Sequence, residues 1–319
     1  MRIINPIYDV AFKYLMEDTE IARKLIGKII GEDIKSLASQ PQEITGKSEK
    51  FGILIFRLDF KATILTESGE YKTVLIELQK AKMYDDLLRF RNYLAENYRK
   101  KVDVETALGI VEEQTLPITT IYFLGFPLPK IETSLLKINR EYIDLVSGKK
   151  LEVKTDFVEK LTHDSFVILI TELPPKERTE LEGILKVFNQ NYQLDSDARL
   201  IEIDELEYAE NELFQEMFAR LQKGATDGEV LKRMQLEDEV ESTIEKHIRD
   251  KEKLVEKVGL QDEALKTKDK ALKTKDQALK TKDEALKIKD EALKTKDEEL
   301  ENQQKLIEEL KKQLKDRKE

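Results

Sequence analysis

Two acidic residues, Asp59 and Glu77, lie in neighbouring apolar stretches and together could hold a metal cation. The stretches 56–60 and 74–80 alternate apolar and polar side chains, which predicts the two arms of a β-hairpin. The segment Glu67-Ser68-Gly69 fits a three-residue hairpin loop with glycine at its left-handed position. Paired positions then sum to 136, so Asp59 lies opposite Glu77, with Cβ atoms about 5 Å apart. Because two like charges repel at that distance, the pair calls for a cation.

A divalent cation with oxygen ligands is the chemistry that this pair predicts. Mg²⁺, or Mn²⁺ in its place, would take the carboxylates of Asp59 and Glu77, the backbone carbonyl of Leu78 and several waters. A water polarised by the metal can attack a phosphodiester while the metal stabilises the charge on the phosphate. Gln79 can orient that water but cannot act as a base. The alternative is an ordinary antiparallel sheet with one solvated face, although directly opposed acids are unfavourable there.

Other charged residues are candidates for substrate contacts. Arg89 and Arg91 follow in a predicted helix and could bind phosphates in a bidentate manner, although a solvated helix face would show the same residues. Lys80 is a further phosphate candidate, but it points to the opposite face if the strand is regular. Asp9 is either an accessory acid of the site or the N-cap of the helix that follows. Lys13, in that helix, is predicted to be a solvated charge.

The pattern around the hairpin predicts helices packed against a mixed sheet. Apolar residues at helical spacing predict that residues 1 to about 40 are helical after a short lead, with helices over 10–16 and about 20–30 and Gly31 as the stop of the second. Further helices are predicted over 84–99 and 176–189. Continuous apolar runs at 117–124 and 165–171 predict buried strands. This order indicates an α/β fold with a mixed sheet core flanked by helices.

Composition restricts the function classes. The chain has 319 residues, no Cys and a net charge of −10, and no apolar run approaches the length of a membrane span. Without a signal-type N-terminal stretch or cysteine, we expect a cytoplasmic protein that does not use a membrane. Lys and Arg number 29 against 32 acids in residues 1–200, but 9 against 17 in 201–260. A broad basic surface is therefore absent, and nucleic acid would need a local patch.

The C-terminal part repeats a seven-residue unit. Thr226 and Glu229 have the spacing of a capping box that opens a long charged helix. From residue 258 one heptad position is apolar throughout, whereas the position three residues later is lysine in five consecutive repeats, from Lys268 to Lys296. A two-stranded coiled coil needs both positions apolar, so the helix either associates weakly with a second copy or remains single, with a length of about 90 Å over some 60 residues.

These patterns predict three parts: a globular domain with the acid pair at 1–200, an acidic helical linker at 201–257 and a heptad-repeat helix, which could form a coiled coil, at 258–319. The third part is predicted to be a spacer or an oligomerisation arm.

The ordered motifs resemble those of the PD-(D/E)XK nuclease superfamily, in its Rpn-type recombination-promoting nuclease and transposase-like branch. Asp59 is followed, after seventeen residues, by Glu77-Leu78-Gln79, and similar segments stand at 8–13, 89–93 and 116–118. The resemblance covers about residues 5–200.

The resemblance implies a restriction-endonuclease-like fold and a Mg²⁺-dependent endodeoxyribonuclease that acts on DNA in recombination or transposition. Two positions depart from the superfamily pattern: Leu58 stands in place of a proline, and Gln79 replaces the usual lysine. Lys80 or Lys82 could partly substitute for that cation. The competing hypothesis is a nuclease-like fold without activity, whose C-terminal helix mediates assembly.

Overall fold

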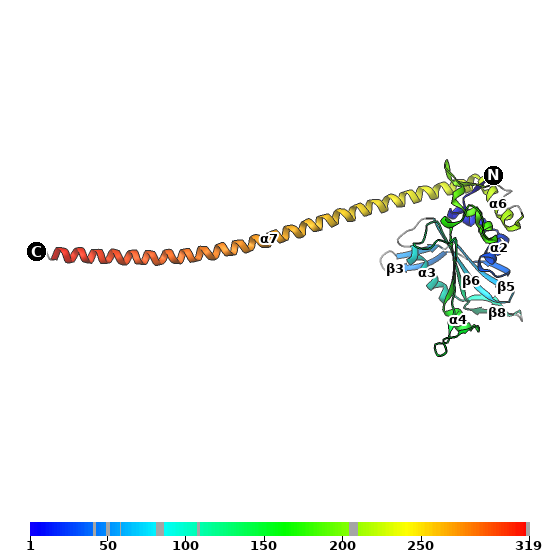
Figure 1. Cartoon of the computed structure of the whole chain (residues 1–319), viewed down its shortest axis with the longest axis horizontal. Helices are drawn as coiled ribbons and strands as arrows, with labels where there is room; N and C mark the ends of the chain where they lie inside the picture. Colours follow the sequence, from blue (N-terminus) through cyan, green and yellow to red (C-terminus); the bar gives the residue numbers. More distant parts are fainter. Residues whose placement is uncertain are drawn as a thin grey trace. The chain divides into compact units, whose positions relative to one another are not determined.

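A six-stranded mixed sheet forms the centre of the fold (Figure 1). The computed structural model describes residues 1–40, 43–48, 52–57, 59–80, 86–106, 109–203 and 210–316. Strand order across the sheet is β10-β13-β9-β6-β5-β2, with β9 parallel to both β6 and β13. The six strands are β2 (Ile34–Ser39), β5 (Phe60–Thr66), β6 (Tyr71–Gln79), β9 (Ile118–Leu124), β10 (Leu135–Ile138) and β13 (His163–Leu169). The expected mixed α/β sheet is therefore confirmed.

The predicted hairpin has the predicted register. Strands β5 and β6 are antiparallel, and their pairs run from Phe60 opposite Ile76 to Leu65 opposite Tyr71, each pair summing to 136. The backbone N–H of Thr66 donates to the carbonyl of Glu70 at 3.0 Å, which closes a three-residue loop. Gly69 has φ 88°, a left-handed conformation that glycine adopts without strain. The alternation of the sequence and its turn thus fix this part of the structure.

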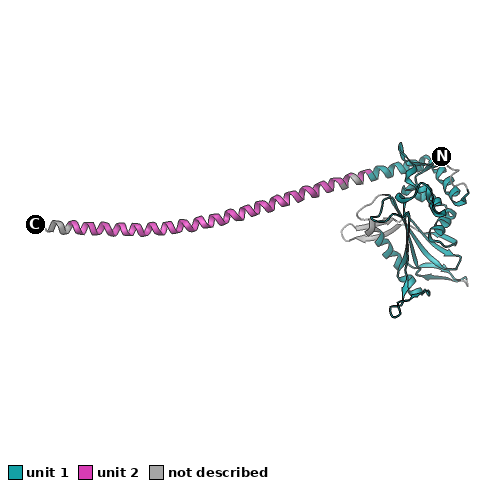
Figure 2. Ribbon diagram, in the orientation of Figure 1, with its two compact units in different colours: residues 1–241 teal, residues 242–319 magenta. Residues whose placement is uncertain are grey.

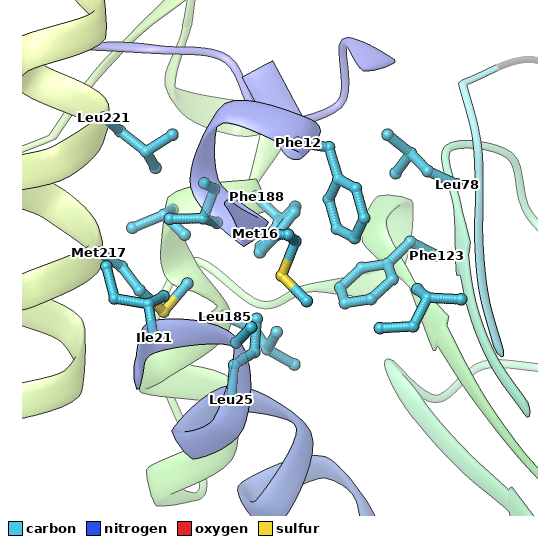
Figure 3. Close-up of a cluster of buried hydrophobic side chains, with 14 of the residues drawn as sticks. Phe12, Met16, Ile21, Leu25, Leu78, Phe123, Leu185, Phe188, Met217 and Leu221 are labelled. Atoms are coloured by element: carbon cyan, nitrogen blue, oxygen red, sulfur yellow. The ribbon is translucent and has the colours of Figure 1, made fainter. Parts of the chain in front are cut away.

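One face of the sheet packs on helices α1 (Asp9–Met16) and α2 (Thr19–Ile30), and α6 (Glu212–Ala225) packs against these two helices in the same core. Figure 3 shows this core, where Phe12 and Met16 of α1 lie beside Phe123 of β9, and Met217 of α6 lies beside Ile21 of α2. The ring centroids of Phe12 and Phe123 are 5.4 Å apart in an edge-on arrangement. This core fixes α1, and with it Asp9, against the carboxyl end of β6.

The opposite face is covered by helix α3 (Asp86–Arg99), so the alternative of a solvated sheet face is wrong. Phe90 and Tyr93 of α3 pack on Leu75 and Ile118 in a second apolar cluster. Glu77 lies on this face of β6 and is 0% exposed. The alternation of the strand is equally compatible with an exposed residue at this position. Because acidic side chains are rarely fully buried, the burial of Glu77 is unusual.

The beginning of the chain is only partly helical. Asp18 caps α2 by accepting from the backbone N–H of Glu20 and of Ile21, and Gly31, with φ 74°, ends the helix. The expectation of helix up to residue 40 is wrong, because Ile34–Ser39 pairs with β5 as an edge strand. Tertiary pairing overrides the local pattern there.

The segment 176–189, expected as one helix, is instead short and divided. It contains α5 (Glu180–Ile184) and the 3-10 helix η2 (Leu185–Phe188). Two more 3-10 helices, η1 (Ile170–Glu172) and η3 (Gln190–Tyr192), and the helix α4 (Asp156–Leu161) lie nearby in the chain. Leu185 and Phe188 are fully buried in the main core.

Four smaller sheets complete the described structure. One joins the N-terminal strand to the end of the folded unit, since Arg2 pairs with Glu202 and Ile4 with Leu200. The strands of these sheets are β1 (Arg2–Ile4), β14 (Gln193–Leu194) and β15 (Asp197–Glu202); β3 (Glu43–Ser48) and β4 (Gly52–Arg57); β7 (Val102–Glu105) and β8 (Val111–Gln114); β11 (Tyr142–Ile143) and β12 (Lys150–Leu151).

The chain divides into two compact units, Met1–Glu241 and Ser242–Glu319 (Figure 2). The first unit extends beyond the expected boundary at residue 200, because α6 buries Leu213, Phe214 and Phe218 in the main core. Residues 212–225 are therefore part of the domain and do not form a linker. No helix of the described residues is long and apolar enough to cross a membrane.

The last helix, α7, runs from Gly228 to Asp316, so the expected long C-terminal helix is confirmed. Asp227 caps it by accepting from the backbone N–H of Glu229 at 2.9 Å, whereas the expected cap, Thr226, donates its hydroxyl to the carbonyl of Lys223. Val230 and Met234, in the first turns, are buried in the core of the first unit. The repeated leucines of the second unit, such as Leu279, are 54–58% exposed.

Candidate active site

Asp59 lies directly before β5 and is held by the facing strand. Its Oδ2 accepts a hydrogen bond from the backbone N–H of Leu78 at 2.5 Å, and its side chain is 13% exposed. Burial raises the pKa of Asp59 well above its usual value, and the charges of Glu77 and Asp9 raise it further, against the N–H of Leu78 and the charge of Lys13. Burial and the two neighbouring acids therefore disfavour the charged form of this carboxyl group.

Glu77 is the second acid of the pair. It follows Ile76, which pairs with Phe60 in the last pair of the ladder, and its charge acts on Asp59, the residue before Phe60. In the parallel direction it lies beside Tyr122 of β9, whose pKa is raised mainly by burial, with a contribution from the charge of Glu77. The predicted proximity of the two acids is present in the structure.

The end of β6 is fixed by a close approach of β9. The backbone N–H of Gly125 donates to the carbonyl of Gln79 at 2.8 Å. A Cβ atom at residue 125 would lie 2.4 Å from the carbonyl oxygen of Lys80, so only glycine fits. Gln79 is half-buried. Gly125 therefore allows the end of β9 to approach the backbone of Gln79 and Lys80 closely.

Helix α1 brings Asp9 and Lys13 close to Asp59. Asp9 is the first residue of the helix and Tyr8 is its N-cap, so the N-cap interpretation of Asp9 is wrong. The Asp9 carboxylate instead binds Lys13 Nζ, at 2.5 Å from Oδ1 and 2.6 Å from Oδ2. Lys13 Nζ lies 4.0 Å from Asp59 Oδ1, and its side chain is 11% exposed. The expectation of a solvated Lys13 is therefore wrong.

Lys80 is held by the beginning of α7. Its Nζ lies 2.7 Å from Glu241 Oε2 and 3.4 Å from Asp238 Oδ1, and 3.6 Å from the centre of the Tyr8 ring. A carboxylate on one side and an aromatic face on the other satisfy this ammonium. The pKa of Tyr8 is raised, first by burial and then by its hydrogen bond to Asp238.

Helix α7 also caps the first turn of α1. Glu237 accepts hydrogen bonds from the N–H of Asp9 at 2.8 Å and of Val10 at 3.2 Å. Burial raises the pKa of Glu237. Sequence reasoning missed this contact, because the capping acid lies 228 residues after the helix that it caps.

The remaining cationic candidates lie on or before α3. Arg91 is exposed on α3. The side chain of Arg89, together with Lys82 and Leu58, lies outside the described residues.

The donor set at the hairpin fits a hard divalent cation. The charges of Glu77 and Asp9 act on Asp59, and Lys13, which is bound to Asp9, partly offsets them. In the part of the chain that the structure describes, no three acids, histidines or cysteines converge closely enough to form a ready metal cage. Mg²⁺ commonly uses one or two protein carboxylates and takes its other ligands from water and substrate phosphate. Asp59 and Glu77 match that requirement.

Comparisons with family models, curated proteins and solved structures gave no match to this chain.

Proposed function

We propose that this chain is a metal-dependent endonuclease that hydrolyses phosphodiester bonds of DNA. The observation that carries the proposal is the proximity of Asp59 and Glu77 at the end of the β5–β6 hairpin, where burial, and then the charge of Glu77, raise the pKa of Asp59. A buried acid pair on a mixed sheet flanked by helices is compatible with the restriction-endonuclease-like core that the motifs resemble. It is also costly for folding, which favours a functional reason for keeping it.

Four residues would take part in metal binding and catalysis at this site. Asp59 and Glu77 would hold Mg²⁺ or Mn²⁺, with the carbonyl of Leu78 as a further ligand. When bound, the metal supplies positive charge against the phosphate and makes water more acidic. The Gln79 amide would orient the attacking water by hydrogen bonding, and it cannot take the proton. The full burial of Glu77 keeps bulk water from its carboxylate.

The charge of the chain bears on how it would bind DNA, and the C-terminal helix bears on how two copies would assemble. With a net charge of −10, the chain would contact DNA through a local patch, for which Arg89 and Arg91 are the candidates. Cutting both strands needs two active sites, which a dimer joined through the exposed leucines of α7 would supply. A cytoplasmic location and a role in recombination or transposition complete the proposal, the latter by resemblance alone.

Nicking of supercoiled plasmid in Mg²⁺ or Mn²⁺ tests this function. We expect Asp59→Asn and Glu77→Gln each to lower the rate by at least roughly 100-fold, the scale on which one charge-stabilising group acts. These substitutions keep side-chain volume, and circular dichroism checks that each variant is folded. The matched control is Asp33→Asn, an exposed acid outside the site. Nicking that persisted in both site variants would refute the assignment of the site.

An inactive nuclease-like fold that assembles through α7 is the second candidate. Two observations favour it: Lys80 is engaged by Asp238 and Glu241, and the leucines of the heptad repeats are exposed. It predicts no nicking by the wild type with any metal, but self-association that depends on these leucines. The plasmid assay and light scattering on the same preparation therefore distinguish the two candidates.

A further inference from the structure

A buried lysine of α1 lies among the acids of the site. The side chain of Lys13 is 11% exposed, and its Nζ lies 4.0 Å from Asp59 Oδ1. Lysine is rarely buried unless a partner balances its charge. Asp9 is that partner, one helical turn earlier, with both carboxylate oxygens within 2.6 Å of Nζ.

The position of Lys13 is fixed by the packing of α1. Phe12 and Met16 are buried in the main core, which turns the face that carries Asp9 and Lys13 toward the end of β6. Glu237 fixes the first turn of the helix by accepting from two of its backbone N–H groups. The ammonium is therefore held in place before any ligand arrives, as a charge-stabilising group requires.

The ammonium has capacity for another acceptor. Lysine carries three N–H donors. Among the described residues, Asp9 is the only hydrogen-bond acceptor of Lys13, because 4.0 Å to Asp59 is too long for a hydrogen bond. A phosphate oxygen that approached Asp59 would meet this donor.

Among the residues whose side chains are described, which do not include Lys82 and Arg89, the other cations near the motif are less suited to this role. Lys80 is engaged by Asp238 and Glu241. Lys61, on β5, has its pKa lowered mainly by burial and then by Lys100, so its environment disfavours positive charge. Arg91 is exposed on α3.

We propose that Lys13 is a further catalytic residue, which binds a nonbridging oxygen of the scissile phosphate and supplies, from α1, the positive charge that Gln79 cannot supply from the strand. This inference rests on the proposed nuclease function. In the hydrolysis the water oxygen forms a bond to phosphorus, the bond from phosphorus to the leaving sugar oxygen breaks, and the proton lost by water is balanced by the proton that the leaving oxygen takes up. Lys13 keeps its own proton throughout and stabilises the charge on the phosphate.

The test uses the full chain and the variants Lys13→Met, which removes the charge at similar length, and Lys13→Arg, which keeps it. The first readout is the affinity for a short DNA duplex by fluorescence anisotropy in Ca²⁺, measured over a range of salt concentrations. We expect Lys13→Met to weaken binding about 10-fold and to lower the slope of log affinity against log salt by about 0.9, the value for one lost phosphate contact. Lys13→Arg should retain the wild-type slope.

The second readout is plasmid nicking, where Lys13→Met should lose roughly 100-fold or more in rate while its affinity for Mn²⁺, measured by calorimetry, stays within about 3-fold of the wild type. A purely structural lysine would lower the melting temperature and leave the salt slope unchanged. An unchanged slope in Lys13→Met, with or without a change in nicking, would overturn the proposal.

The design separates this proposal from the nuclease function itself. A chain that does not nick DNA, but whose salt slope falls in Lys13→Met, would contradict the nuclease function and support the phosphate contact of Lys13. If Lys13→Met does not fold, Asp9→Asn decides, since it frees Lys13 from its anchor and keeps the charge. We expect Asp9→Asn to lower the nicking rate at least 10-fold with an unchanged salt slope, and wild-type nicking in that variant would overturn the proposal.

Discussion

Glu237 of α7 accepts a hydrogen bond from the backbone N–H of Asp9, the first residue of α1, at 2.8 Å. A carboxylate at this position satisfies a donor that the helix itself cannot, and it interacts favourably with the helix dipole. The contact joins the first turns of the long helix to the helix that carries Asp9 and Lys13. The beginning of α7 is thus part of the folded unit that forms the candidate site.

Removal of this cap should destabilise the first unit. We expect Glu237→Ala to lower the free energy of unfolding by about 1 kcal/mol, the usual effect of losing a capping side chain. Urea unfolding followed by circular dichroism measures it. The matched control is Glu252→Ala, an exposed acid of α7, which should change stability by less than about 0.5 kcal/mol. Equal effects of the two substitutions would contradict the cap assignment.

Asp59 should lower stability at neutral pH. Its pKa is higher in the folded protein than the 3.8 of an exposed aspartate, mainly because of burial, so the folded state holds the proton more tightly. The stability that this provides is complete below about pH 4 and is lost as pH rises through the folded-state pKa. Asp59→Asn should therefore raise the melting temperature at pH 7, whereas Asp33→Asn should leave it unchanged.

A divalent cation should restore the stability that is lost when Asp59 ionises. Binding to Asp59 and Glu77 in the folded state stabilises it by mass action, so Mn²⁺ should raise the melting temperature of the wild type in proportion to the logarithm of its concentration. Asp59→Asn should abolish this shift. Calorimetric scans with and without EDTA measure both effects, and an equal shift in the variant would place the metal elsewhere.

The hairpin could be predicted from sequence because it depends on residues that are close together in the chain. Alternation defines the two arms, Gly69 defines the turn, and together they fix every pair from Phe60 and Ile76 onward. The acid pair followed from that register. The fully buried environment of Glu77 did not, because it depends on α3 packing over that face of the sheet.

Contacts between distant segments could not be predicted in this way. Lys13 has the appearance of a surface lysine until α1 packs against the end of β6, although its spacing of four residues from Asp9 was a usable signal. Ile34–Ser39 forms a strand only because β5 offers an edge. The acidic segment that contains Glu237 was indistinguishable from a charged linker, since its partners lie at the other end of the domain.

Lys61 should make stability depend on pH in the alkaline range. Burial, and then the charge of Lys100, lowers its pKa from 10.5 to about 8. Between these values the unfolded chain binds the proton and the folded chain does not, so stability rises with pH from about 8 to 10.5. Lys61→Met should raise the free energy of unfolding at pH 7 by on the order of 3 kcal/mol, since one pKa unit is about 1.4 kcal/mol.

Urea unfolding at pH 7 and at pH 9.5 measures this effect of Lys61. The exposed Lys35→Met is the control and should change neither value appreciably. A stability difference between wild type and Lys61→Met that stays constant across this range would show that Lys61 has an ordinary pKa in the folded protein.

The exposed leucines of the heptad repeats should join two copies of the chain. Leu265, Leu279 and Leu293 occupy the same heptad position and are 57–58% exposed, whereas the lysines three residues later would repel one another across a dimer. We therefore expect a dimer of the 37.2 kDa chain that strengthens as salt screens the lysines. Replacing the three leucines with Asp should give a monomer by light scattering.

The matched control places Asp at Thr267, Thr281 and Thr295, which introduces the same charges away from the leucine position. Dimers of equal strength in both triple variants would exclude the leucines as the interface, and a monomeric wild type at high salt would identify α7 as a single helix.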